Sequence, residues 1–162
     1  MSTEALLAEL RRRGWTVAVA ESLTGGALCA ELVSVPGASD VLRGGVVAYA
    51  TPIKHSVLGV DAALLAAHGP VHPEVARQMA DGVRSALAVD GRAADVGVST
   101  TGVAGPTPQG GQPVGTVHIG VSIGERSTSR AFRFDGDRAT IRTASVEAAI
   151  AVVSGVLSGS VE

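Results

Sequence analysis

The sequence predicts an α/β protein: a three-layer α/β/α sandwich with a mixed, mostly parallel sheet of about five strands, one of them antiparallel. Short apolar runs have the length and composition of buried strands: 17–20, 45–50 and 95–101. Helical periodicity lies before, between and after these runs: 3–13, 26–34, 73–88 and 137–157. Two further strand patterns, 114–123 and 127–134, are joined by a short turn as in a β-hairpin, which supplies the antiparallel strand.

The ends of the predicted helices carry recognisable signals. The first helix ends at Gly14, which favours a C-cap, and the second ends before Pro36. Pro73 opens the third helix at its first position, and Asp137 caps the last one. Two shorter segments precede Pro73, a turn or short helix and then a brief helix: 52–58 and 62–67.

Length and composition limit the class of protein. The 162 residues, 46% of them apolar, predict one domain, 1–162, with a sizeable core. A net charge of −2 and an aromatic content of 2% argue against a nucleic-acid groove, so we expect no nucleic-acid partner. No apolar run reaches the roughly 18 residues of a membrane span, and the N-terminus lacks a signal-peptide pattern. With Cys29 as the single cysteine, an internal disulfide is excluded, and we expect a cytoplasmic protein with no membrane partner.

Polar residues after the strands are the candidates for chemistry, because ligands of parallel sheets bind beyond the carboxyl ends of the strands. Ser22 follows the first strand, and Thr24, Gly25 and Gly26 open the next helix. On one interpretation Ser22 or Thr24 is the N-cap of that helix. On the other, Ser22 attacks a substrate while backbone N–H groups near Gly25 or Gly26 hold an anion or a developing oxyanion. The two interpretations are compatible, because Thr24 can cap the helix while Ser22 reacts.

Lys54 is the candidate base for Ser22. It is the only lysine in the chain and, with Tyr49, it follows the second strand. A solitary lysine is ordinarily a solvated surface residue, and a base must be neutral, which requires the lysine pKa to fall from about 10.4 to about 7 or 8. Burial and the positive end of the helix after Ser22 would both lower that pKa. Tyr49 would hold the lysine or relay a proton, or else be a half-buried strand aromatic.

Further candidates follow the third strand and open the last helix. Thr101, Gly102 and Gly105 lie in a glycine turn that permits close approach to a ligand, although a tight loop explains them nearly as well. Arg138 and Arg142 stand four apart on one face of the last helix, where they either bind a phosphate or form ion pairs with Asp135 or Glu147. The sequence contains no metal-ligand pattern, so we expect neither a metal nor a cofactor.

Five groups of motifs stand in order along nearly the whole chain: AESLTGG, PGASDVLRGGVVAYATPIKHSVLGV, HGPVHPEVARQMA, TTGVAGP with PVGTVHIG, and FDGDRATIR. Together they resemble the CinA C-terminal domain family, the nicotinamide-nucleotide amidohydrolases. The resemblance implies an α/β/α fold and hydrolysis of the carboxamide of nicotinamide mononucleotide to nicotinate mononucleotide and ammonia. It also implies a serine nucleophile working with a lysine, which correspond here to Ser22 and Lys54, with Tyr49 beside them.

The resemblance further implies which residues line the pocket: Thr24, Gly25, Gly26, Thr101, Gly102 and Gly105. Glu21 would face the cationic pyridinium ring of the substrate or form a salt bridge. The family usually has cysteine where this chain has Leu23, which leaves the serine as nucleophile. The chain also departs from the family pattern at Thr51-Pro52 and at Pro70-Val71-His72. These changes flank the pocket and bear on substrate preference more than on the type of reaction.

Two alternatives to this activity belong to other classes: a non-catalytic nucleotide-binding or regulatory module, and an amidase for another small carboxamide. Longer family members carry an additional N-terminal domain with pyrophosphatase activity, so we expect this chain to be a stand-alone form. The expected partner is a small nucleotide substrate. Because small pockets of this kind often lie near subunit contacts, we also expect a homo-oligomer.

Overall fold

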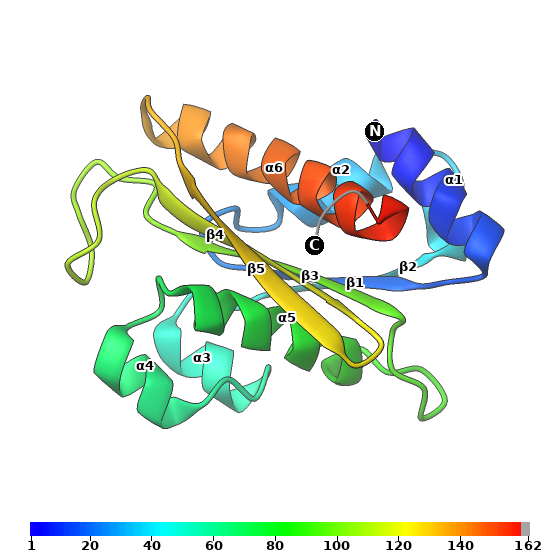
Figure 1. Ribbon diagram of the computed structural model, residues 1–162, viewed down its shortest axis with the longest axis horizontal. Coiled ribbons are helices and arrows are strands. Elements are labelled where there is room, and N and C mark those ends of the chain that lie inside the picture. The colour runs from blue at the N-terminus through cyan, green and yellow to red at the C-terminus, as the bar shows by residue number, and fades with distance from the viewer. Residues whose placement is uncertain (160–162) are drawn as a thin grey trace.

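The computed structural model describes residues 1–159 and has three layers (Figure 1). The middle layer is a sheet of five strands: β1 (Val17–Glu21), β2 (Leu42–Val47), β3 (Val96–Gly102), β4 (Thr116–Ile123) and β5 (Arg126–Arg133). One face of the sheet is covered by α1 (Thr3–Arg13), α2 (Ala27–Val33) and α6 (Arg138–Ser158). The other face is covered by α3 (Thr51–Ser56), α4 (Ala62–His68) and α5 (Pro73–Ala86), and a short 3-10 helix, η1 (Ala38–Asp40), precedes β2.

The directions of the strands bring the carboxyl ends of β1, β2, β3 and β5 to one edge of the sheet. Across the sheet the order is β2-β1-β3-β4-β5. β1 pairs in parallel with β2 and β3, whereas β4 is antiparallel to both β3 and β5. One strand therefore runs against the other four, which confirms the predicted mixed sheet. The register places Glu21, the last residue of β1, beside Val47 of β2 and Thr100 of β3.

The bounds of β2 differ from the prediction of 45–50. The strand occupies Leu42–Val47. It begins earlier in the sequence than predicted, because Leu42 pairs with Val17 at the start of β1. After Val47 the Ala48 N–H donates to the Glu21 carbonyl at 2.8 Å, and the chain then turns into α3. Because β2 ends at Val47, the segment 48–50 lies outside the strand, where it forms part of the site described below.

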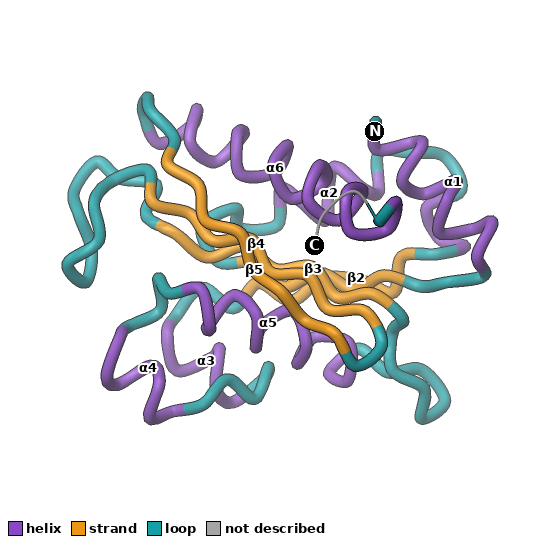
Figure 2. The backbone as a smooth tube through the Cα atoms, in the orientation of Figure 1, coloured by secondary structure: helices purple, strands orange, loops and turns teal. Residues whose placement is uncertain are grey.

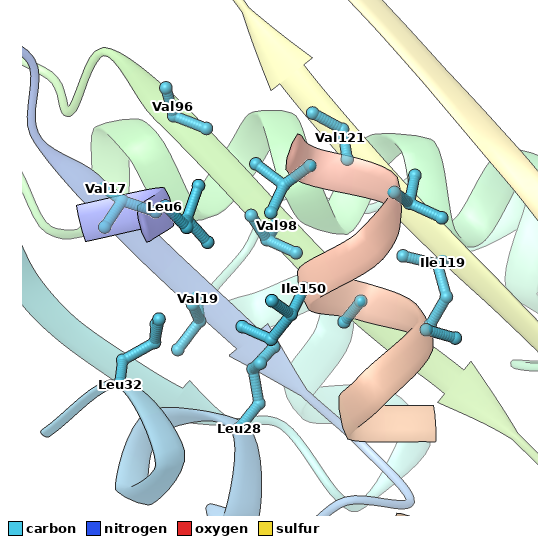
Figure 3. Packing of buried hydrophobic residues seen from close by; sticks show 14 of the residues in the cluster. Leu6, Val17, Val19, Leu28, Leu32, Val96, Val98, Ile119, Val121 and Ile150 are labelled. Carbon is cyan, nitrogen blue, oxygen red and sulfur yellow. The ribbon is translucent and has the colours of Figure 1, made fainter. Parts of the chain in front are cut away.

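The main core lies between the sheet and the α1, α2 and α6 layer (Figure 3). Leu6, Leu28 and Ile150 come from the three helices and lie near Val19 and Val98 of the sheet. Burial of each such side chain is worth about 1.5–3 kcal/mol relative to exposure. This packing stabilises β1 and β3 as neighbours and so fixes the loops that follow them.

On the opposite face, α5 packs against strand positions that lack a side chain. A side chain at Gly97 would clash with the Ala80 carbonyl, and one at Gly120 would clash with the Ala76 carbonyl. The two glycines therefore allow the helix to lie directly on the backbone of β3 and β4. A second apolar cluster, which includes Met79 of α5, fills the rest of this face.

By length and composition alone, α6 could cross a membrane, which differs from the expectation that no segment would. Ile141, Ala149 and Val153 of this helix are buried in the main core against the sheet. A helix that fills a core meets the same criterion of length and apolar composition.

Candidate active site

Ser22 and Lys54 form a hydrogen-bonded pair at the carboxyl edge of the sheet. Ser22 directly follows β1, and Lys54 lies in α3, which follows the neighbouring parallel strand β2. The Lys54 Nζ lies 2.8 Å from Ser22 Oγ, 2.7 Å from the Ala48 carbonyl oxygen and 3.4 Å from the Tyr49 carbonyl oxygen. The pairing of β1 with β2 thus brings together two side chains that are 32 positions apart in the chain.

Lys54 is buried, with only 1% of its surface exposed. This burial lowers the pKa of Lys54 to about 8, because the ammonium loses its hydration. Within residues 1–159 no carboxylate forms an ion pair with it to offset that loss. Once neutral, the amine can donate two N–H bonds to the carbonyls of Ala48 and Tyr49 and accept the Ser22 hydroxyl proton with its lone pair. Its three partners therefore suit a base that acts on Ser22.

The Ser22–Lys54 pair opens into a cavity of about 300 Å³. Leu23, Tyr49 and Arg138 form further parts of its wall, as does the loop between β3 and β4, which extends beyond the end of the sheet in Figure 2. Lys54 and Arg138 are the charged residues among those described that line the cavity, and no carboxylate belongs to the lining. The cavity therefore favours an anionic ligand. Elsewhere in residues 1–159, no group of three His, Cys, Asp or Glu side chains lies close enough to hold a metal ion.

Arg138, the first residue of α6, reaches the cavity through its guanidinium. Its Nη1 donates to the Gly105 carbonyl at 2.8 Å, and its Nη2 donates to the Tyr49 hydroxyl at 3.1 Å. Tyr49 thus contacts Lys54 through its backbone and Arg138 through its phenol. The residue is 60% exposed and lies beyond β2, so the interpretation as a half-buried strand aromatic is wrong.

Glu21, at the end of β1, is completely buried and caps α2. Its Oε1 accepts the N–H groups of Gly26 at 3.2 Å and Leu28 at 2.8 Å, and its Oε2 accepts that of Cys29 at 3.0 Å. A carboxylate at this position satisfies N–H groups that have no partner within the helix and interacts favourably with the helix dipole. The carboxylate therefore points to the helix, and Glu21 does not belong to the cavity lining.

The predicted cap by Ser22 or Thr24 is wrong. The N-cap of α2 is Gly26, and no N-cap side chain bonds to the helix. Thr24 instead shares a hydrogen bond of 2.7 Å with the hydroxyl of Thr100 on β3, in a buried position. This contact ties the turn after β1 to the neighbouring strand and leaves the Ser22 hydroxyl to Lys54.

The backbone N–H groups of Gly25 and Gly26 are already paired. Gly25 donates to the Ser22 carbonyl at 3.1 Å, and Gly26 donates to the Glu21 carboxylate. Both glycines have positive φ angles, 60° and 102°, which favour glycine at these positions. The expectation that these N–H groups hold an anion is therefore wrong, because each has an acceptor within the protein.

Arg142 lies one turn after Arg138 but has a different environment. Its Nε donates to the Leu23 carbonyl at 2.9 Å, and its Nη2 donates to the Thr24 carbonyl at 2.8 Å. It therefore braces the turn behind Ser22 and lies outside the cavity lining. The ion pairs considered for the two arginines, with Asp135 or Glu147, are not found in the part of the chain that the structure describes.

Thr101, Gly102 and Gly105 all line the cavity. Thr101 donates its hydroxyl to the Pro70 carbonyl at 2.7 Å, which holds the segment before α5 against the end of β3. A Cβ at Gly102 would lie 2.6 Å from the Thr116 carbonyl oxygen, so the close pairing of β3 with β4 requires glycine here.

The sequence-family model of the CinA C-terminal domain matches residues 1–157 of this chain. The chain belongs to the CinA C-terminal domain family. A CinA-like protein from Frankia casuarinae is 50% identical over 154 residues, which cover 95% of this chain and 34% of that protein. A putative competence-damage inducible protein from Geobacillus kaustophilus is 46% identical over 137 residues, or 84% of this chain and 32% of that protein. This CinA chain thus spans about a third of the length of the curated relatives it matches.

Solved structures share the CinA fold of this chain. The competence-damaged protein (CinA) superfamily protein from Escherichia coli superposes with a TM-score of 0.88 at 29% identity, covering 95% of this chain and 87% of that one. The competence damage-inducible protein A from Klebsiella pneumoniae gives a TM-score of 0.85 at 33% identity and covers 98% of both chains.

Several cavity residues of this CinA domain were missed by sequence reasoning: Val103, Ala104, Thr107, Pro108 and Gln109. The sequence shows that the loop after β3 is glycine-rich, but which of its residues line the cavity depends on how the loop folds over the edge of the sheet. Pro70 and Val71 precede α5 and enter the cavity because Thr101 bonds to the Pro70 carbonyl. A local sequence signal does not report such a contact between distant segments.

Proposed function

We propose that this CinA domain hydrolyses the carboxamide of nicotinamide mononucleotide, forming nicotinate mononucleotide and ammonia, with Ser22 as nucleophile and Lys54 as base. The observation that supports this most is the 2.8 Å contact between Ser22 Oγ and the buried Lys54 Nζ. A serine hydroxyl needs a base within hydrogen-bond reach to become a nucleophile, and this distance satisfies that need. A lysine pKa of about 8 makes the neutral form accessible near neutral pH.

In the first half of the reaction, neutral Lys54 takes the hydroxyl proton as Ser22 Oγ attacks the carboxamide carbon. The carbonyl π electrons move to oxygen and give a tetrahedral oxyanion. When this collapses, the C–N bond breaks and Lys54 returns its proton to the departing nitrogen, which leaves as ammonia. An ester between the substrate acyl group and Ser22 remains.

In the second half, water hydrolyses this ester. Lys54, neutral again, takes a proton from the water as its oxygen attacks the acyl carbon. Collapse of the second tetrahedral species breaks the bond to Ser22 Oγ, which recovers its proton from Lys54. The product carboxylic acid loses its proton to solvent, so the enzyme finishes as it began.

The charge of the cavity supports a mononucleotide as the substrate. Arg138 presents a guanidinium in a cavity without a carboxylate among its described lining, and a guanidinium matches the geometry of a phosphate group. The volume of about 300 Å³ lies at the lower end of the range for small-molecule sites, about 300–1,000 Å³. In this arrangement Arg138 binds the phosphate, Tyr49 positions the guanidinium, and Arg142 positions the turn that carries Ser22.

Ammonia release from nicotinamide mononucleotide and from free nicotinamide tests this proposal. We expect the mononucleotide to be hydrolysed faster, and Ser22→Ala and Lys54→Met each to lower its turnover by about 10³-fold or more. Arg130→Met, an exposed change on β5, is the matched control and should leave the rate unchanged. Saturable binding of the mononucleotide without ammonia release would contradict the proposal and favour a non-catalytic module. Faster hydrolysis of free nicotinamide would favour an amidase for another carboxamide.

A further inference from the structure

We infer that the backbone N–H groups of Leu23 and Ala104 form the oxyanion hole of this site. This inference rests on the proposed acyl-transfer function, because it concerns the charge that forms when Ser22 attacks a carbonyl carbon. It replaces the expectation that Gly25 and Gly26 supply the donors, since both of those N–H groups have acceptors within the protein.

Leu23 immediately follows the nucleophile and lies in a tight turn. The Gly25 N–H donates to the Ser22 carbonyl at 3.1 Å, which closes a four-residue turn with Leu23 and Thr24 in the middle. The N–H groups of the two middle residues cannot bond within such a turn. Leu23 is 4% exposed and lines the cavity, and its N–H has no acceptor among the described residues.

Ala104 lies two residues beyond the end of β3, as Leu23 lies two residues beyond the end of the neighbouring strand β1. It follows β3, is 4% exposed and lines the cavity, and its N–H has no acceptor in residues 1–159. Its neighbour Val103 is different, because the Val103 N–H donates to the Thr116 carbonyl at 2.9 Å. The antiparallel pairing with β4 thus ends at Val103, and Ala104 is the first residue of the loop whose N–H is free of it.

Pairing of β1 with β3 brings together the two segments that carry these N–H groups. The two strands are parallel neighbours with Glu21 opposite Thr100, and the Ser22 N–H donates to the Thr100 carbonyl at 3.0 Å. The segments that leave the two strands therefore run side by side around Ser22. One donor from the residue after the nucleophile and one from a neighbouring strand-exit loop is the arrangement that α/β-hydrolases use for the same purpose.

The energetic cost of an unpaired N–H group indicates that an acceptor binds there during the reaction. Nearly all buried backbone N–H groups in proteins have a partner, and an unpaired one costs about 1–3 kcal/mol. Here the acceptor arrives with the reaction, as the negative oxygen that forms on the substrate. Donors that are already in place in the wall of the cavity stabilise that charge without rearrangement.

Replacement of single amide bonds by esters tests the assignment, because it removes one N–H and keeps the side chain. The α-hydroxy analogue of leucine at position 23, or of alanine at position 104, is incorporated into the full chain. Neither N–H has a partner in residues 1–159, so we expect only a small loss of thermal stability, from the Ser22 and Val103 carbonyls that become weaker ester acceptors for Gly25 and Gly115. We expect kcat for ammonia release from nicotinamide mononucleotide to fall by about 10²–10³-fold for each ester, with KM changed less than about threefold.

Leu58 provides the matched control, since it is 3% exposed and its N–H also has no described acceptor, but it belongs to the second apolar cluster and lies outside the cavity lining. The ester at position 58 should retain the wild-type kcat. Wild-type turnover by the Leu23 or the Ala104 ester would overturn the assignment. An equal loss from the Leu58 ester would overturn it as well, because the effect would then not be specific to the two positions.

A second probe separates this inference from the choice of substrate. Pyridine-3-boronic acid forms a tetrahedral adduct with a nucleophilic serine and places a negative oxygen where the oxyanion would lie. We expect the wild-type protein to form this adduct, and the Leu23 and Ala104 esters to bind the probe at least tenfold more weakly than the Leu58 ester. Adduct formation with that loss, but without hydrolysis of the mononucleotide, would reject the proposed substrate and retain the oxyanion hole. Equal affinity across the three esters would reject the oxyanion hole, as would failure of the wild-type protein to form the adduct.

Discussion

The difference in free energy of unfolding between Lys54→Met and the wild type should favour the variant more at neutral pH than at alkaline pH. Methionine keeps the length and apolar character of the side chain but removes the amine, which in the wild type is 1% exposed. The fall of the lysine pKa from 10.5 to about 8 corresponds to about 3 kcal/mol, at about 1.4 kcal/mol for each pKa unit. The folded wild-type protein bears this cost wherever both folded and unfolded chains hold the proton.

The pH dependence isolates this cost from the lost hydrogen bonds. Lys54→Met also leaves the Ala48 carbonyl without its donor, which costs about 1–3 kcal/mol at every pH. Below pH 8 the penalty on the wild type is fully present. Between pH 8 and 10.5 the folded protein has lost the proton that the unfolded chain still holds, so wild-type stability rises with pH. The advantage of the variant over the wild type should therefore shrink by about 3 kcal/mol between pH 7 and pH 10.5.

Urea unfolding of both proteins, followed by circular dichroism at intervals of one pH unit, measures this difference. Other groups titrate in both proteins and cancel in the comparison, so the difference reports Lys54. Its slope should reach at most about 1.4 kcal/mol per pH unit. A difference that stays constant from pH 7 to pH 10.5 would refute the reasoning, because it would mean that the fold does not perturb the amine.

Three further predictions follow from the same geometry. Glu21→Gln should lower the free energy of unfolding by about 2 kcal/mol in urea titrations, because the neutral amide replaces a charged acceptor of three N–H groups; an unchanged midpoint would contradict this cap. Arg138→Met should raise KM for nicotinamide mononucleotide about tenfold or more and leave KM for free nicotinamide nearly unchanged. Equal effects on the two KM values would mean that Arg138 does not bind the phosphate. The kcat/KM for ammonia release should rise with pH through an apparent pKa near 8 and level off above it, since Lys54 must be neutral to act as base; a profile that falls over this range would exclude that role.

Most of the fold could be predicted from the sequence because its signals are local. The apolar run of β1, Gly14 after α1, Pro73 at the start of α5 and Asp137 before α6 each mark an element directly, and the elements lie close to their predicted bounds. β2 could not be placed as well, because its start depends on pairing with Val17 of β1. Pairing across the sheet is a property of two segments and leaves little trace in either one.

The candidate site shows the same division between local and distant information. Ser22 and Lys54 could be selected from the strand exits and from the single lysine of the chain, and the structure brings their side chains together. The cap of α2 could not be predicted, because Glu21 reaches N–H groups that lie up to eight residues further on. The different environments of Arg138 and Arg142 could not be predicted either, because Arg138 bonds to Tyr49, 89 positions away, and Arg142 bonds to the turn after β1.

The state of the Lys54 amine is the central claim, and the chain offers a direct way to measure it. Because Lys54 is the only lysine, incorporation of ¹³Cε-labelled lysine gives a single side-chain NMR signal whose shift follows protonation. We predict that this signal titrates with a pKa near 8 in the folded protein and near 10.5 in urea. A folded-state pKa near 10.5 would contradict the account, because the amine would then hold its proton at neutral pH and could not serve as the base for Ser22.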